Sequence, residues 1–95
     1  MTFTIYQLPA EHNNCFMNYE WAEKHGGINV REYESIYTGE MEGTDPIAIL
    51  EALYVTYNRY RPEGYTGRSL SVSDLVALED TGTYFCDSIG WKKIN

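Results

Sequence analysis

Strand-forming side chains dominate the first residues of the chain, and this run ends at a proline. The segment Phe3–Leu8 is rich in strand-forming side chains and ends at Pro9, so it predicts a first β-strand. Farther along, Tyr33–Met41 shows a period of two, in which tyrosine, serine and glycine alternate with glutamate, isoleucine and threonine. Neither face of this second segment is purely apolar, but its period still predicts a strand.

Two other segments have helical spacing. The first covers roughly Cys15–Lys24, where Asn13 or Asn14 can cap the amino end and paired glycines supply the stop. The second starts with a cap followed by proline, Thr44-Asp45-Pro46, an order that suits the first turn of a helix. We expect this helix to end near Asn58. Its predicted apolar face consists of Ile47, Leu50, Leu53, Tyr54 and Tyr57.

The rest of the chain predicts short strands joined by turns. Arg59–Gly67 contains one proline and two glycines and is expected to be a loop. The strands expected after it are Ser69–Val72, Leu75–Leu78, Thr83–Asp87 and Trp91–Ile94. The chain therefore predicts one α+β domain over residues 1–95, with a mostly antiparallel sheet of five to six strands and two helices on one side of it. The expected order is β-α-β-α-β-β-β-β.

Charge is the feature of composition that changes this picture. The formal net charge is −7, and all of it falls in residues 1–58, which carry nine acids and two bases. Between residues 32 and 58 there are six acids and no base. An acidic field repels phosphate, so direct binding of duplex DNA is disfavoured. The same field attracts a basic partner surface, including one that normally holds nucleic acid.

The amino-terminal residues have neither the basic start nor the apolar run of a signal peptide. No stretch approaches the roughly 18 apolar residues that a membrane span needs. We therefore expect a cytoplasmic protein that does not bind membranes. Cys15 and Cys86 are then expected to be reduced, buried thiols rather than a disulfide.

The stretch GRSLSVSD, from Gly67 to Asp74, has a serine at every second position and ends on an acid. A nucleophilic serine needs a base within hydrogen-bond reach, and the only histidines, His12 and His25, lie far upstream. We favour a structural role instead. The Ser73 hydroxyl and the Asp74 carboxylate would bond backbone N–H groups and fix a turn before the next strand.

Metal binding is a further possibility that the sequence only half supports. His12 and Cys15 have the spacing of metal ligands, and His25 and Cys86 could complete a set of four. Structural zinc sites usually combine two close-spaced pairs, and Cys86 has no second ligand near it in the sequence. We expect neither a metal nor a cofactor.

Several short motifs follow one another along the chain. They are Tyr57-Asn58, Pro62, Gly67, Ser69–Asp74, Leu75-Val76, Tyr84-Phe85, Asp87-Ser88 and Gly90-Trp91, with Ile5–Leu8 and Ile36–Glu40 upstream. In this order they resemble the YodL-like domain family over nearly the whole chain, and the SLSVSD block is the most specific of them. Trp91 stands where phenylalanine is commoner in the family, which does not disturb the match.

The resemblance implies a small domain found in proteins of plasmids, phages and integrative elements. It occurs alone or as a module of very large proteins that are delivered with the DNA. The resemblance implies no established activity. A role in countering host defence systems is attributed to such modules by association only.

Two surfaces are candidates for binding a partner. The loop after the second helix interleaves tyrosine with arginine, which suits protein interfaces and, less well given the net charge, single-stranded nucleic acid. The alternative is that Tyr57 packs in the core and the arginines pair with Glu63 or neighbouring acids. Glutamates at period two would stand roughly 7 Å apart along a strand, close to the phosphate spacing of DNA. The alternative is an ordinary solvated face.

Together these features predict a non-enzymatic, mobile-element binding protein that inhibits a host nucleic-acid-targeting defence complex, of the anti-CRISPR or anti-restriction type. An acidic face would occupy a basic groove and the Arg/Tyr loop would anchor it. The expected partner-binding residues are Glu32, Glu34, Glu40, Glu42, Asp45, Glu51, Arg59, Tyr60, Arg61, Tyr65 and Arg68. The alternatives are a generic protein-interaction or regulatory module without DNA mimicry and, less favoured, a small hydrolase using Ser71, Ser73 or Cys86.

Overall fold

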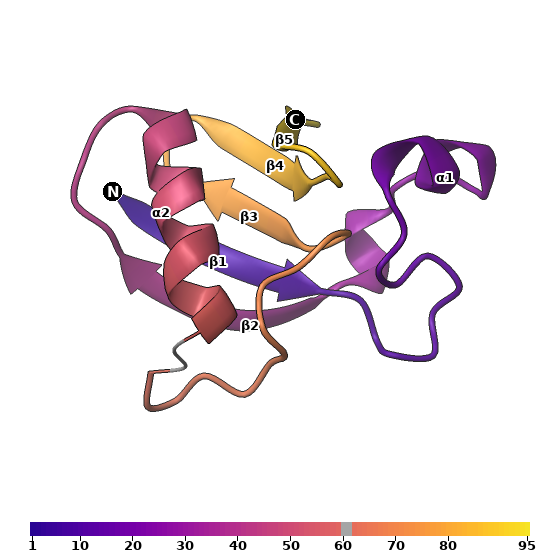
Figure 1. The fold of residues 1–95 in the computed structure, drawn as a ribbon, viewed down its shortest axis with the longest axis horizontal. Helices are drawn as coiled ribbons and strands as arrows, with labels where there is room; N and C mark the ends of the chain where they lie inside the picture. Colours follow the sequence, from indigo (N-terminus) through magenta and orange to yellow (C-terminus); the bar gives the residue numbers. More distant parts are fainter. Residues whose placement is uncertain (60–61) are drawn as a thin grey trace.

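A single antiparallel sheet organises the protein. The structure is a computed structural model and describes residues 1–59 and 62–95. The strands are β1 (Thr2–Gln7), β2 (Glu34–Glu40), β3 (Leu75–Leu78), β4 (Gly82–Cys86) and β5 (Trp91–Lys93), in the spatial order β2-β1-β3-β4-β5. The described residues also form helices α1 (Tyr19–Lys24) and α2 (Pro46–Arg59) and a 3-10 turn, Val30–Glu32 (Figure 1). The expected α+β class, with an antiparallel sheet of five strands and two helices, is confirmed.

Helix α2 covers one face of the sheet (Figure 1). As the sequence predicts, Asp45 caps it: Oδ1 accepts a hydrogen bond from the Ile47 N–H at 3.2 Å. The buried residues of the helix are Ile49, Leu50, Leu53 and Tyr57. The predicted apolar face is wrong at Ile47 and Tyr54, which are 53% and 38% exposed. At 100° per residue these two side chains lie roughly 90° from the centre of the buried stripe, so Ile49 occupies the core instead.

The segment that carries α1 covers part of the opposite face. Tyr19 packs edge-on against Phe85 with 5.6 Å between ring centroids. Phe85 pairs with Leu75, which pairs with Tyr6, and Tyr6 points away from the α2 side because its neighbour Ile5 lies in the core beneath α2. The expectation that both helices lie on one side is therefore wrong.

Helix α1 also begins later than the sequence predicts. Its cap is Asn18, whose side chain accepts a hydrogen bond from the Trp21 N–H at 2.9 Å. Residues near Cys15 cannot continue the helix because Phe16 has a φ of +69°, in the left-handed region. The Phe16 N–H bonds the Ser73 hydroxyl at 2.9 Å instead of a helical carbonyl.

A β-bulge interrupts β2. Ile5 pairs with Tyr37 but Tyr6 pairs with Ser35, so Ile36 is an extra residue, and both Ile36 and Tyr37 pack against the core. Because the bulge adds one residue to β2, the side chains that follow Ile36 lie on the face opposite to the one they would take in a regular strand. As a result Glu34 shares a face with Gln7, whereas Glu40 shares the opposite face with Thr2.

The segment Ser69–Val72, expected as a strand, is a loop. Side chains from other elements satisfy its backbone in place of a strand partner. The Leu70 carbonyl accepts from Asn58 Nδ2 at 2.9 Å, and the Ser71 N–H donates to the Asp74 carboxylate at 2.8 Å. The sheet therefore has the lower of the two expected strand numbers.

Candidate functional site

The acidic residues predicted to form one face are divided between two ends of β2. Glu32 lies in the 3-10 turn, where one of its oxygens is 2.9 Å from His12 Nε2. Glu34 and Glu40 lie on opposite faces of the strand because of the bulge. Glu51 is separate again, on the outer surface of α2. The structure therefore does not arrange these acids as a single row with phosphate spacing.

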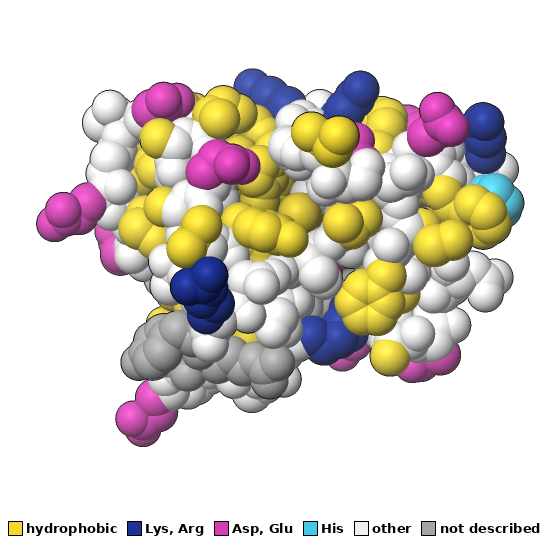
Figure 2. Space-filling view, in the orientation of Figure 1, with side chains coloured by type: hydrophobic (Ala, Val, Ile, Leu, Met, Phe, Trp, Pro, Cys, Tyr) yellow, Lys and Arg dark blue, Asp and Glu magenta, His cyan; other side chains and the backbone are white. Residues whose placement is uncertain are grey.

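A different acidic surface forms where β2 ends and α2 begins. Thr2 lies at its centre: its hydroxyl donates to Glu40 at 2.7 Å, and its carbonyl accepts from the Glu79 N–H at 2.9 Å. Because β1 lies between them, Glu40 and Glu79 are two strand spacings apart, and their backbones are separated by about 10 Å. Glu42 and Asp45 follow β2 along the chain, and Asp80 follows Glu79. We call these five exposed residues, Glu40, Glu42, Asp45, Glu79 and Asp80, the acidic end. In Figure 2, acidic side chains lie at the end of the molecule where the β2–α2 connection runs, and others lie at the opposite end and along the lower edge.

Within the part of the chain that the structure describes, no ion pair involves the acidic end, although the Met1 ammonium lies beside it and donates to the Met41 carbonyl at 2.7 Å. The ion pairs of the described residues are Lys24 with Glu20 and His12 with Glu32. Glu79 and Asp80 were missed as site residues because the sequence predicts a hairpin there without showing which strand lies beside it. The pairing of β3 with β1 brings Glu79 to the same end of the sheet as Glu40, with Thr2 of β1 between them.

The Arg/Tyr loop is used mainly inside the molecule. Tyr65 stacks on Tyr57 with ring centroids 5.6 Å apart and donates its hydroxyl to the Arg68 carbonyl at 2.6 Å. Arg68 donates from Nη2 to the Leu8 carbonyl at 2.9 Å. The expected burial of Tyr57 is confirmed.

Of the other loop residues predicted to bind a partner, Arg59 is exposed at the end of α2. Tyr60 and Arg61 lie outside the described residues. Arg68 also places its guanidinium 5.0 Å from the centroid of the Phe16 ring. Among the described residues of the loop, Arg59 is therefore accessible to a partner, whereas Tyr65 and Arg68 hold the loop to the sheet.

The GRSLSVSD stretch builds a buried polar cluster. Asp74 is fully buried, and its Oδ2 accepts hydrogen bonds from the Ser71 N–H at 2.8 Å and from Gln7 Nε2 at 3.0 Å. Gln7 also bridges to Arg68, whose N–H donates to Gln7 Oε1 at 3.0 Å. The predicted structural role of Asp74 is confirmed: its carboxylate closes the turn that precedes β3.

Burial dominates the electrostatics of Asp74. It raises the pKa of this carboxyl from 3.8 to about 7, although the bonds from Ser71 and Gln7 and the charge of Arg68 act in the opposite direction. Oδ1 has no hydrogen-bond partner among the described residues. Burial disfavours the charged carboxylate, so the folded protein favours the protonated form of Asp74.

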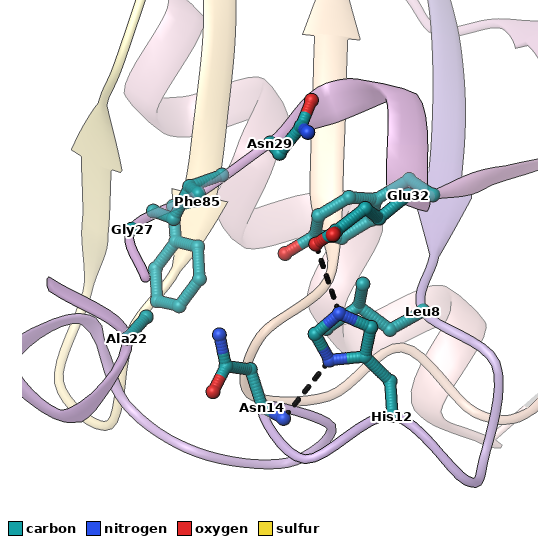
Figure 3. Close-up of a pocket in the computed structure, with 10 residues that line it drawn as sticks. Leu8, His12, Asn14, Ala22, Gly27, Asn29, Glu32 and Phe85 are labelled. Carbon is teal, nitrogen blue, oxygen red and sulfur yellow. Dashed lines mark hydrogen bonds and ion pairs between the residues drawn. The ribbon is translucent and has the colours of Figure 1, made fainter. Parts of the chain in front are cut away.

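Ser73, one of the three serines of the stretch, is buried and its hydroxyl is occupied. Ser73 is 1% exposed, and its hydroxyl accepts from the Phe16 N–H while its carbonyl accepts from the Tyr33 hydroxyl at 2.7 Å. The histidine rings bond elsewhere: His12 to Glu32 and the Asn14 N–H (Figure 3), and His25 to the Trp21 carbonyl. Among the described residues, neither histidine ring bonds the Ser73 hydroxyl, as acyl transfer by this serine would require.

The four candidate metal ligands do not converge in the described residues, where no group of three or more His, Cys, Asp or Glu side chains is placed to hold a metal ion. Cys15 and Cys86 are both buried and are not joined, so their expected burial is confirmed. Burial raises the pKa of both thiols, that of Cys86 to about 12. A thiol that stays protonated is a poor nucleophile.

Comparison with known proteins gives a family and nothing more specific. The family model described as YodL-like domain matches residues 2–95. No curated protein and no solved structure matches the chain. Among the described residues, no helix has the length and apolar character needed to cross a bilayer.

Proposed function

We propose that the chain, which belongs to the YodL-like domain family, is a non-enzymatic binding protein. Its acidic end docks on a basic surface of a protein partner. The observation that carries this proposal is a set of five exposed acids in two separate segments, residues 40–45 and 79–80, of which none forms an ion pair with another described residue. Such a field speeds and orients association with a basic surface.

The proposed class of partner is a host defence protein, or its nucleoprotein complex, whose basic groove holds nucleic acid. Binding there would inhibit the complex by excluding its nucleic acid. The net charge of −7 supports this choice, because such grooves attract polyanions. The bulge in β2 argues against literal mimicry of a phosphate row, so the acidic end acts through its total field rather than its spacing.

The test is capture of partners from a lysate of the host with three versions of the protein. One is the natural sequence. The second, the acidic-end triple variant, carries Glu40→Lys, Glu42→Lys and Glu79→Lys. The third carries Glu11→Lys, Glu20→Lys and Glu63→Lys, which change the net charge equally at exposed positions elsewhere.

We expect a partner that is retained at 50 mM NaCl by the natural protein and by the control variant. It should be lost at 500 mM NaCl and lost with the acidic-end triple variant, because both remove the field. Added duplex DNA should displace it. A partner that the acidic-end triple variant holds equally well would contradict the proposal, and one that duplex DNA does not displace would contradict the choice of a nucleic-acid groove.

A further inference from the structure

A cleft lies between the outer surface of α2 and the turn that joins β4 to β5. The helix contributes Glu51 and Tyr54, and β5 contributes Trp91. Cys86 and Asp87, where β4 ends, complete the lining of a space of about 150 Å³. Two aromatic rings and two carboxylates therefore line one small concavity at the surface.

One carboxylate of the cleft, that of Asp87, is held by backbone N–H groups, and Lys92 Nζ lies 4.8 Å from the centroid of the neighbouring Tyr19 ring. Asp87 Oδ1 accepts from the Tyr19 N–H at 3.1 Å and from the Ser88 N–H at 2.8 Å, which fixes its direction. Glu51 is exposed on the helix. Neither residue forms an ion pair within the described part of the chain.

The raised pKa of the Cys86 thiol also reflects the negative charges of the cleft. The Cys86 side chain is 2% exposed, and burial is the largest cause of its raised pKa, with Asp74, Asp87 and Glu51 adding to it in that order. Glu51 and Asp87 are thus close enough to act on one buried atom. The thiol stays neutral and contributes an apolar surface.

Exposed apolar side chains surround the cleft. Ile89, in the β4–β5 turn, is 93% exposed, and Ile47 and Val55 are 53% and 61% exposed. Ile47 and Val55 each lie one helical turn from Glu51, so the three share the outer surface of α2. Hydrophobic side chains are spread over this side of the molecule in Figure 2. Exposed apolar side chains that border polar ones mark protein-binding surfaces.

We propose that the cleft binds the side chain of one lysine or arginine of a protein partner, with Tyr54 and Trp91 against its stem and cation and with Glu51 and Asp87 pairing its charge. The proposal rests on the proposed function in one respect, that the partner has a basic surface. The cleft adds a specific contact to that function, because it recognises a single lysine or arginine on the basic surface of the partner. The exposed Ile89 would contact apolar atoms beside this basic residue.

The cleft can be tested without the partner. The probe is Nα-acetyl-lysine N-methylamide, titrated into ¹⁵N-labelled protein, and Nα-acetyl-norleucine N-methylamide is the uncharged comparison. We expect saturable shifts of the Gly90 amide and the Trp91 indole N–H with the lysine probe, at millimolar concentration, and none with the norleucine probe. Glu51→Gln and Tyr54→Ala should each weaken binding by about threefold or more.

The control is Glu20→Gln, an exposed acid on α1, which should bind the probe like the natural protein. Equal shifts with both probes, no saturable shift, or unchanged binding by Glu51→Gln would overturn the proposal. The acidic-end triple variant should still bind the lysine probe. Failure of the cleft and failure of the acidic end are therefore separate results.

Discussion

Asp74 is a fully buried carboxyl that ends the GRSLSVSD stretch. It ties the loop to β1 through Gln7 Nε2 and closes its own turn through the Ser71 N–H. Gly67 opens the same stretch for a steric reason: a methyl group there would lie 2.5 Å from Gln7 Oε1 and from Ile36 Cγ2. Both ends of the stretch are thus fixed by contacts with β1, which accounts for the motif without catalysis.

The raised pKa of Asp74 predicts a pH-dependent stability. A carboxyl with an ordinary pKa of 3.8 and a folded pKa of about 7 stabilises the fold fully below pH 3.8 and loses that contribution as the pH rises through 7. The free energy of unfolding should therefore fall between pH 4 and 7 by up to about 1.4 kcal/mol per pH unit. Asp74→Asn should flatten this decline.

Urea denaturation at pH 5 and pH 8 measures the effect. The natural protein should lose about 2 kcal/mol more than Asp74→Asn between these two values. Asp80→Asn, at an exposed acid, should behave like the natural protein. The same decline in Asp74→Asn would show that another group is responsible.

At the scale of elements, caps and a bulge decide where the candidate residues lie. Asp45 starts α2 and also belongs to the acidic end, so it has a structural role and a proposed binding role. The extra residue Ile36 sends Glu34 and Glu40 to opposite faces of β2. Tests of the acidic end must therefore separate loss of charge from loss of the helix cap.

Asp45 allows that separation. Asp45→Ala removes the cap and should lower the free energy of unfolding by about 1 kcal/mol. Asp45→Asn retains a capping oxygen and should cost a few tenths of a kcal/mol, through the lost charge at the helix amino end. Chemical denaturation followed by circular dichroism distinguishes the two, and equal losses in both variants would mean that charge, not the cap, stabilises this end of α2.

At the scale of the whole molecule, unbalanced charge is the dominant property. The acidic end adds repulsion that no ion pair among the described residues relieves. Glu40 and Glu79, two strand spacings apart, are separated by about the screening length of 0.1 M salt, roughly 10 Å. Salt should therefore change both the partner affinity and the stability of the free protein.

We predict that the melting temperature of the natural protein rises from 10 mM to 300 mM NaCl, because screening weakens this repulsion. Each reversal of the acidic-end triple variant adds two units of charge, which brings the formal net charge from −7 to −1. Its melting temperature should rise less. Differential scanning calorimetry of both proteins, with sodium sulfate avoided, provides the measurement; an equal rise in both would locate the repulsion elsewhere.

The sequence by itself determined the class of the fold and most of its elements. The strand-forming side chains of Phe3–Leu8 and the Asp45-Pro46 start of α2 are local signals, and local backbone preferences enforce them. The role of Asp74 was equally predictable, because a short acid after serines bonds backbone N–H groups within a few residues. These features depend on neighbours in the chain.

Tertiary structure alone decided which charges share a surface. The bulge at Ile36 forms because two successive side chains, Ile36 and Tyr37, both gain from burial in the core, and no local pattern shows this. Glu79 joins Glu40 only because β3 pairs with β1 across more than seventy residues of chain. The cleft of Glu51, Tyr54 and Trp91 likewise requires α2 to pack beside β5. Surfaces assembled from distant segments depend on packing, which local sequence does not encode.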